Sequence, residues 1–193
     1  MKLNVENDDG QISPTGIWPI EYNKYHVTSN ILKQFILHIL PNNVPVYDFG
    51  CGSGSYIKHL LSYGYSCIGY EGTYQKNELP IKQQDITIEL PSPKTRGSVL
   101  CLEVMEHIPS KFEKITLDNI IKHCDNHLII SWGIVGQPGI GHVNCRSAWY
   151  VIRALSRYGF KLQKKETRTI RDQINRSNKQ LWFTKSLYIF KRC

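Results

Sequence analysis

The sequence has 193 residues, of which 41% are hydrophobic and 21% charged, a composition typical of one globular domain with a sizeable core. The first residues lack the apolar run of a secretory leader and no later stretch is long enough to cross a bilayer, so we expect a cytoplasmic protein without a membrane partner. The six cysteines have neither C-x-x-C nor zinc-ligand spacing, which argues against a cysteine-based metal framework and favours reduced thiols.

The formal net charge of +8 is unevenly distributed. Residues 144–193 hold 13 Lys and Arg but only two acidic residues, whereas residues 1–143 hold 11 basic and 14 acidic residues. Such asymmetry is typical either of a surface for an anionic partner, such as a nucleic acid, nucleotide-sugar or phosphorylated metabolite, or of a solvated basic face.

The first 27 residues are polar and rich in turn formers, which predicts an irregular segment or flap before a single core domain over residues 28–193. A helix should open that core, with Thr28 or Ser29 as its cap and Pro41 after its end, because its apolar positions recur on one face.

Alternation of apolar segments and helix signals then predicts an α/β domain. Strands are expected at residues 44–49, 67–71, 81–86 and 98–102, with a helix over 56–63 after the first. The interval between the second and third strands is too short for more than a rudimentary helix.

The second half continues this alternation. Ser110 and Glu113 have capping-box spacing and predict the start of a helix that runs towards His123. A strand at 127–132, a loop rich in glycine at 133–144 and a helix from about 147 to 159 should follow. A last strand is expected at 181–190.

The most informative segment follows the first strand and reads D-F-G-C-G-S-G over residues 48–54. Three alternating glycines allow a tight turn and a close approach to a ligand. The spacing differs from the dinucleotide fingerprint and from the phosphate-binding P-loop. Glu71, at the end of the second strand, could accept both ribose hydroxyls of an adenosine.

The chain resembles the class I (Rossmann-like) S-adenosylmethionine-dependent methyltransferases of the type 11/12 group. D-F-G-C-G-S-G is similar to that family's motif I, and L-E-V-M-E-H-I-P at 102–109 is similar to its motif after strand four. The resemblance covers roughly residues 22–160. It implies a single doubly wound, mostly parallel sheet of seven strands with the last one antiparallel. The connection 171–180 would then lie at the carboxyl end of the sheet, which would bring the basic surplus near the active site.

The resemblance also implies S-adenosylmethionine as donor and S-adenosylhomocysteine as product. Asp48 would contact the donor's ammonium, Glu71 its ribose and Asp85 its adenine amine, with Ile86 against the adenine ring. Tyr22, Tyr25 and His26 could close over the donor. The expected cofactor-binding set is Asp48, Gly50, Cys51, Gly52, Gly54, Glu71, Gly72, Asp85, Ile86, Leu102, Glu103 and Tyr25.

Catalytic groups are expected in the loops after the fourth and fifth strands. His107 and His142 could each serve as general base for a hydroxyl acceptor, and Glu103 or Glu106 could orient or share that role. The expected substrate-binding residues are Trp132, Asn144, Arg171 and Arg176.

The same residues allow a second interpretation. Glu103, Glu106, His107 and His142 resemble the E-x-x-E-H…H pattern of small-RNA 3′-terminal ribose methyltransferases, in which a metal grips the terminal hydroxyls. The E-V-x-E-H-I sequence is also widespread in metal-free relatives, so we predict no metal, with a divalent ion as the alternative.

No motif for methylating base amino groups, cytosine C5 or mRNA-cap ribose is recognisable. The leading hypothesis is an enzyme that O-methylates a hydroxyl of a sugar, in a glycan or nucleotide-sugar, or of a similar small molecule. The alternatives are an RNA ribose 2′-O-methyltransferase, favoured by the basic last quarter, and a catalytically silent subunit that binds the donor.

Overall fold

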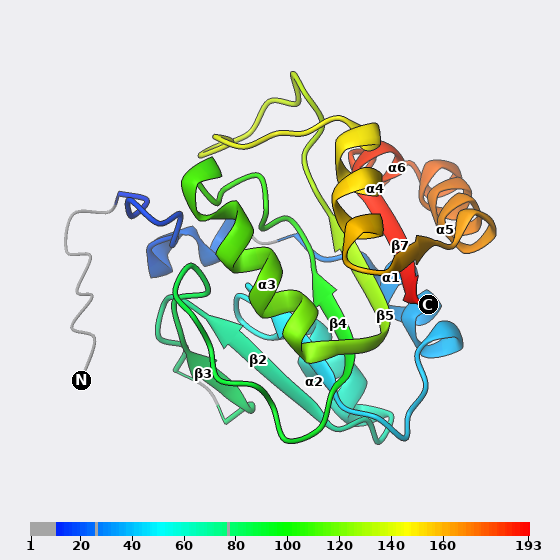
Figure 1. The fold of residues 1–193 in the computed structure, drawn as a ribbon, viewed down its shortest axis with the longest axis horizontal. Coiled ribbons are helices and arrows are strands. Elements are labelled where there is room, and N and C mark those ends of the chain that lie inside the picture. The colour runs from blue at the N-terminus through cyan, green and yellow to red at the C-terminus, as the bar shows by residue number, and fades with distance from the viewer. Residues whose placement is uncertain (1–10, 26, 77) are drawn as a thin grey trace.

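The computed structural model describes residues 11–25, 27–76 and 78–193, without the side chains of residues 23–25. One sheet of seven strands runs through this part of the chain, in the order β3-β2-β1-β4-β5-β7-β6 (Figure 1). The strands are β1 (Val46–Phe49), β2 (Cys67–Glu71), β3 (Ile81–Gln83), β4 (Gly97–Cys101), β5 (Cys124–Ser131), β6 (Phe160–Leu162) and β7 (Leu187–Arg192). The helices are α1 (Asn30–Ile39), α2 (Ser55–Ser62), α3 (Glu113–His123), α4 (Ala148–Arg157), α5 (Lys164–Ser177) and α6 (Phe183–Ser186), with 3₁₀ turns η1 (Ile20–Tyr25) and η2 (Ser110–Phe112).

The pairing confirms the predicted sheet. β1, β2, β3, β4 and β5 are parallel, whereas β7 is antiparallel to both of its neighbours, β5 and β6. The strand order reverses at β1, which lies between β2 and β4. At such a reversal, the segments that follow two adjacent strands turn to opposite sides of the sheet. This leaves a crevice at the carboxyl ends of those strands, where doubly wound sheets bind ligands.

Side chains that alternate along the strands form a hydrophobic core on each face of the sheet. Leu128 and Ile130 of β5 pack in a cluster with residues of α3 and α4. Ile129, between them, packs in a second cluster with residues of α1, α2 and α5. The sheet is therefore covered on both faces, as the near-continuous apolar strands require.

The predicted starts of two helices are confirmed. Ser29 caps α1 by accepting a hydrogen bond from the backbone N–H of Leu32, and Ser147 caps α4 through Tyr150. The prediction of a capping box at Ser110 is wrong. Residues 110–112 form η2, and the Glu113 carboxylate accepts hydrogen bonds from Arg146 instead of turning back to cap the helix.

The last quarter differs most from the prediction. The connection over 171–180 is not an open loop, because α5 occupies residues 164–177 and buries Thr167, Ile170 and Ile174. The last strand begins at Leu187 instead of 181, since α6 precedes it. No helix in the described part of the chain is long and apolar enough to span a membrane.

Candidate active site

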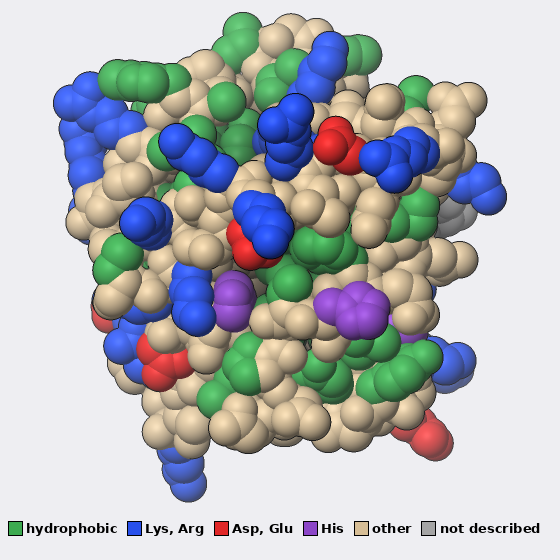
Figure 2. Space-filling model, turned by 90° about the vertical axis from the view of Figure 1, so that its right-hand side faces the viewer, with side chains coloured by type: hydrophobic (Ala, Val, Ile, Leu, Met, Phe, Trp, Pro, Cys, Tyr) green, Lys and Arg blue, Asp and Glu red, His purple; other side chains and the backbone are tan. Residues whose placement is uncertain are grey.

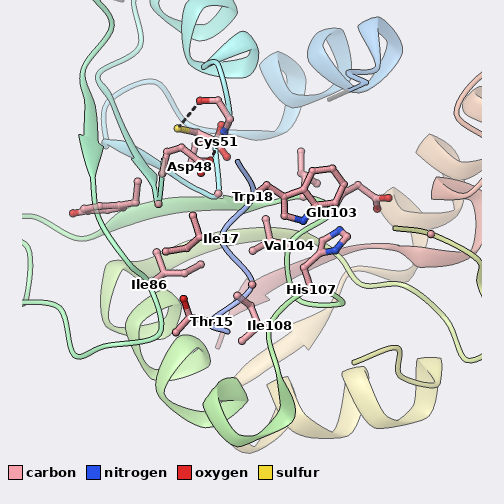
Figure 3. Close-up of a pocket in the computed structure, with 18 of the residues that line it drawn as sticks. Thr15, Ile17, Trp18, Asp48, Cys51, Ile86, Glu103, Val104, His107 and Ile108 are labelled. Atoms are coloured by element: carbon pink, nitrogen blue, oxygen red, sulfur yellow. Dashed lines mark hydrogen bonds between the residues drawn. The ribbon is translucent and has the colours of Figure 1, made fainter. Parts of the chain in front are cut away.

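A cavity of about 350 Å³ lies at the carboxyl ends of β1, β2 and β4 (Figure 3). Its walls are the glycine loop after β1, the end of β2, residues 84–86 and the loop after β4. Residues 15–18 of the N-terminal segment, Gly139, Ile140 and His142 of the loop after β5, and Trp182 and Phe183 at the start of α6 also line it. The volume falls within the range of small-molecule sites.

The glycine loop is tied to the end of β2. Gly50, Gly52 and Gly54 all have positive φ values, between 53° and 81°, a conformation that glycine adopts without strain. The Glu71 carboxylate accepts hydrogen bonds from the backbone N–H of Gly52 at 2.8 Å and of Thr73 at 3.3 Å. Each carboxylate oxygen retains a lone pair for a ligand hydroxyl.

Asp48 is a buried carboxyl at the end of β1, only 3% exposed, and its Oδ2 has no hydrogen-bond partner in the described structure. Burial, with a smaller contribution from the charge of Glu71, raises the pKa of Asp48 to about 8. An unpartnered buried carboxyl is costly unless a ligand supplies a donor or a positive charge.

The remaining polar group on this side of the cavity is Asp85. Its Oδ1 accepts hydrogen bonds from the backbone and the hydroxyl of Thr87 at 2.8 and 2.7 Å. Ile86 follows it, and both line the cavity. Burial raises the pKa of the Cys51 thiol, which keeps it protonated.

Glu103 and Glu106 form an acidic pair in the loop after β4. Glu103 has a φ of 57°, unusual outside glycine, and Ser131 holds it by accepting from its backbone N–H and donating to its Oε1 at 2.7 Å. Burial raises the pKa of Glu103 to about 7, opposed by the Ser131 hydrogen bond. Glu106 is fully buried, and among the described residues no side chain hydrogen-bonds its carboxylate, although the backbone N–H groups of Glu106 and Gly133 face it and favour its charged form. Burial and the charge of Glu103 raise its pKa well above the ordinary value.

His107 and His142 face each other across the cavity wall, with ring centroids 5.0 Å apart. The Nδ1 of His107 lies 3.2 Å from the carbonyl oxygen of Gly141, and the Nδ1 of His142 lies 3.1 Å from that of Gln137. A carbonyl can only accept, so both Nδ1 atoms carry a proton, and in a neutral imidazole the lone pair is then on Nε2. In Figure 3, Glu103 and His107 lie on the side of the cavity opposite Asp48 and Ile86.

Most of the predicted cofactor residues line the cavity. Those that do are Asp48, Gly50, Cys51, Gly52, Glu71, Gly72, Asp85, Ile86, Leu102 and Glu103. Gly54 does not; it caps α2, and a side chain there would collide with Leu79 and Ile81. The Tyr25 side chain and His26 lie outside the described residues, and Tyr22 contacts the edge of Trp18.

The predicted substrate-binding residues lie elsewhere. Trp132 is completely buried, and its Nε1 donates to the carbonyl oxygen of Asn144 at 2.6 Å. Asn144, 3% exposed, donates to Glu113, so both belong to the packing beneath the loop. Arg171 donates to the carbonyl oxygens of Leu187 and Lys185, and its guanidinium covers the ring of Tyr188.

Arg176 is exposed on α5 and does not contribute to the cavity either. None of the described lining residues is Lys or Arg. The basic surplus therefore does not form the cavity wall, although Trp182 and Phe183 of the basic last quarter do line the cavity. Figure 2 shows Lys and Arg spread over one side of the molecule.

The N-terminal segment contributes lining residues that the sequence did not reveal: Thr15, Gly16, Ile17 and Trp18. The hydroxyl of Thr73 donates to the carbonyl oxygen of Trp18. The ring of Trp18 packs edge-to-face with the ring of His107, and the two ring centroids are 4.9 Å apart. The sequence offered one signal for this segment, the presence of Gly16. In the structure Gly16 has a φ of 90°, a turn conformation that glycine adopts easily.

No protein-family model and no curated protein matches this sequence. Among solved structures, magnesium protoporphyrin IX methyltransferase (ChlM) from Synechocystis PCC 6803 with bound SAM is 15% identical, with a TM-score of 0.57 over 90% of this chain and 79% of that one. The [4+2]-cyclase SpnF is 10% identical, with a TM-score of 0.58 over 96% and 84%.

A small RNA methyltransferase is 16% identical, with a TM-score of 0.57 over 84% of this chain and 24% of that one. These likenesses cover 84–96% of this chain. With the predicted strand order and the glycine loop at the carboxyl end of β1, they establish the architecture. The protein has the class I, Rossmann-like fold of the S-adenosylmethionine-dependent methyltransferases.

Proposed function

We propose that the protein is a cytoplasmic enzyme that binds S-adenosylmethionine in the cavity and transfers its methyl group to a hydroxyl of a sugar or similar small molecule. The observation that carries the donor assignment is the row of acidic side chains along the strand ends. Asp48 has an unpartnered oxygen for the ammonium group and Glu71 retains lone pairs for the ribose hydroxyls. Asp85, which lines the same cavity, is the candidate partner of the adenine amine.

Methyl transfer from a sulfonium is an in-line displacement, so the protein must hold donor and acceptor in line. A hydroxyl acceptor loses its proton as the new bond forms. The Nε2 lone pair of His107, at the side of the cavity opposite Asp48, is suited to receive that proton. So is that of His142, whose ring packs against His107. Glu103 is the further candidate for this role.

The lack of Lys and Arg among the described lining residues supports an acceptor whose reacting end carries no negative charge. This favours a sugar or small hydroxylated molecule over an RNA end.

An RNA ribose acceptor is the second candidate. The basic last quarter of the chain and the likeness to a small RNA methyltransferase support it. The solved structures with this fold include a [4+2]-cyclase, so the fold carries more than one chemistry. The third candidate is a subunit that only binds the donor.

Donor binding is tested by calorimetry with S-adenosylmethionine. Glu71→Gln removes the negative charge that accepts from the Gly52 N–H and, in the proposal, from the ribose hydroxyls. The affinity for the donor should fall about 10- to 100-fold, which corresponds to one or two charge-assisted hydrogen bonds. Glu89→Gln, at an exposed position, is the matched control. Equal affinities in both variants would overturn the donor assignment.

Acceptor class is tested by transfer of radiolabelled methyl into a fractionated cell extract, with and without ribonuclease. Label that survives ribonuclease, in carbohydrate or small molecules, supports the leading proposal. Label lost to ribonuclease, with activity that falls steeply as salt rises, would replace it with the RNA acceptor. With an acceptor in hand, His107→Gln or His142→Gln should lower turnover about 100-fold or more while donor affinity is kept.

A further inference from the structure

We propose that the carboxyl edge of the sheet, beside the cavity, is a surface that docks the protein on an anionic lipid bilayer. Two segments form this docking edge, residues 133–153 and 173–186. Ser131 at the end of β5 pairs with Leu187 at the start of β7, so both segments reach the same edge of the sheet. In Figure 1 the loop between β5 and α4 rises above the sheet at the top of the molecule, and α4 begins there.

Large apolar side chains are exposed along the first segment. Four of them are between 53% and 71% exposed: Val135, Ile140, Val143 and Trp149. In the second segment Leu181 is exposed as well. Single exposed apolar side chains are ordinary, whereas a group gathered at one edge marks a surface that another apolar body covers.

The backbone beneath these side chains is anchored. The N–H groups of Val143 and Arg146 donate to the carbonyl oxygens of Glu106 and Gly133, at 2.9 and 2.8 Å. Trp149 lies in the first turn of α4, which the Ser147 hydroxyl caps. The apolar side chains can therefore enter a bilayer interface while the loop keeps its structure.

The docking edge is also positively charged. Its two segments hold five Lys and Arg and no Asp or Glu. Arg146 pairs with Glu113, whereas the other four have no ion-pair partner among the described residues: Arg153, Arg176, Lys179 and Lys185. Figure 2 shows hydrophobic side chains along the upper border of the molecule, with Lys and Arg below them. Unpaired cations beside apolar side chains complement the negative surface of an anionic membrane.

Trp149 combines both features. It is the exposed tryptophan of the edge, and the guanidinium of Arg153 lies over its ring, 4.8 Å from the centroid. Tryptophan is enriched at the level of lipid headgroups, where its ring contacts the acyl boundary and its N–H stays among polar groups. We expect Trp149 to be the strongest single contact with the bilayer.

The combination favours a bilayer over nucleic acid. RNA would use the cations and could stack on Trp149, but it would leave the three aliphatic side chains of the loop in water. A bilayer uses both kinds of side chain, because the apolar ones enter the acyl boundary while the cations stay among the headgroups. Ile140 also lines the cavity, so a docked chain has its cavity beside the membrane.

A docking surface goes beyond the proposed function, because it concerns how the enzyme meets a membrane and not the donor. It also replaces the expectation of no membrane partner, which considered only stretches long enough to cross a bilayer.

The test is co-sedimentation of the full chain with vesicles of phosphatidylcholine, either alone or with about 30% phosphatidylserine. The protein should sediment with the anionic vesicles and much less with the neutral ones, and added salt should reduce the binding. Trp149→Ala should weaken binding about 10-fold or more, because the indole no longer enters the interface. Tyr63→Ala is the matched control, since Tyr63 is an exposed aromatic residue at the end of α2, and it should bind as the wild type does.

Lys179→Glu tests the charge. It should weaken binding at least about fivefold, which is the contribution of one basic residue near an anionic surface. Lys94→Glu is the control for this change, because Lys94 is exposed and precedes β4 at the opposite edge of the sheet.

No sedimentation with the anionic vesicles, or equal binding by the wild type, Trp149→Ala and Lys179→Glu, would overturn the docking edge. Binding of a single-stranded RNA without binding to vesicles would assign the edge to nucleic acid instead. A dimer that light scattering detects for the wild type but not for Trp149→Ala, again without binding to vesicles, would assign it to a second copy of the chain.

The donor site is measured separately. Calorimetry with S-adenosylmethionine in the absence of vesicles should give the same affinity for Trp149→Ala and the wild type, because Trp149 does not line the cavity. Loss of vesicle binding with donor binding intact therefore reports on the docking edge alone.

Discussion

Asp48 is the side chain whose ionisation depends most directly on what occupies the cavity. Its burial and the charge of Glu71 raise its pKa to about 8, so at neutral pH the ligand-free protein holds this carboxyl largely protonated. A donor that places an ammonium group beside Oδ2 favours the carboxylate and lowers that pKa. Binding should therefore release a proton at pH values between the lowered pKa of the complex and about 8.

Calorimetry at pH 7 in buffers of different ionisation enthalpy measures this proton. The apparent binding enthalpy of S-adenosylmethionine should vary with the buffer for the wild type and much less for Asp48→Asn. Affinity of the wild type should rise as pH rises towards 8, because less work is then needed to ionise Asp48. An enthalpy that is the same in every buffer would contradict this role.

The sequence located the cavity residues at strand ends, and Glu103, His107 and His142 in the loops, but it misplaced Trp132 and Asn144. Asp48, Glu71 and Asp85 could be placed because carboxyl ends of parallel strands meet at one edge of a sheet. Trp132 and Asn144 could not, since the direction of their side chains is set by each other and by Glu113, 31 residues from Asn144 in sequence.

At the scale of elements, the segment over residues 13–18 acts as one wall of the site. Ser13 closes a turn through the backbone N–H of Ile17, and Gly16 lies so close to the carbonyl oxygen of His107 that a Cβ would collide with it. The position of this wall therefore depends on one glycine.

Gly16→Ala should displace the wall and weaken donor binding about 10-fold, equivalent to about 1.4 kcal/mol. Gly64→Ala is the matched control, because Gly64 has a similar positive φ of 80° but no heavy atom within 4 Å of the place where a Cβ would lie. Both variants should lose some stability from backbone strain, and only the first should lose affinity in calorimetry. Unchanged affinity in Gly16→Ala would show that the wall does not contact the donor.

Helix α5 shows why the last quarter was harder to predict. Only two of its 14 residues, Ile170 and Ile174, are large and apolar, and both are fully buried in the cluster that includes α1 residues. Two apolar positions give too weak a periodicity to identify a helix from the sequence. Tertiary packing against α1, rather than local propensity, stabilises it.

For the whole molecule, the two-sided core sets the stability. Leu100 in β4 is fully buried and packs in the same cluster as residues of α1, α2 and α5. Leu100→Ala should lower the free energy of unfolding by about 2–5 kcal/mol, as for other buried leucines. Leu61→Ala, at an exposed position, should cost much less; urea denaturation of both variants measures the difference.

Similar losses in the two variants would mean that Leu100 does not belong to the cooperative core. The sheet itself was predicted well, because β1, β2, β4 and β5 each carry an apolar run between turn signals. The antiparallel direction of β7 came from the family resemblance, since periodicity says nothing about which way a strand runs.

The place of β7 has a consequence for how the protein is made. Residues 187–192 follow every other strand in the chain, yet they lie between β5 and β6 and pair with both. Until they leave the ribosome, one edge of β5 is an open row of backbone donors and acceptors beside apolar side chains. A nascent chain in that condition is open to pairing with its neighbours. The chain should therefore depend on chaperones most in the interval between the synthesis of β5 and that of β7.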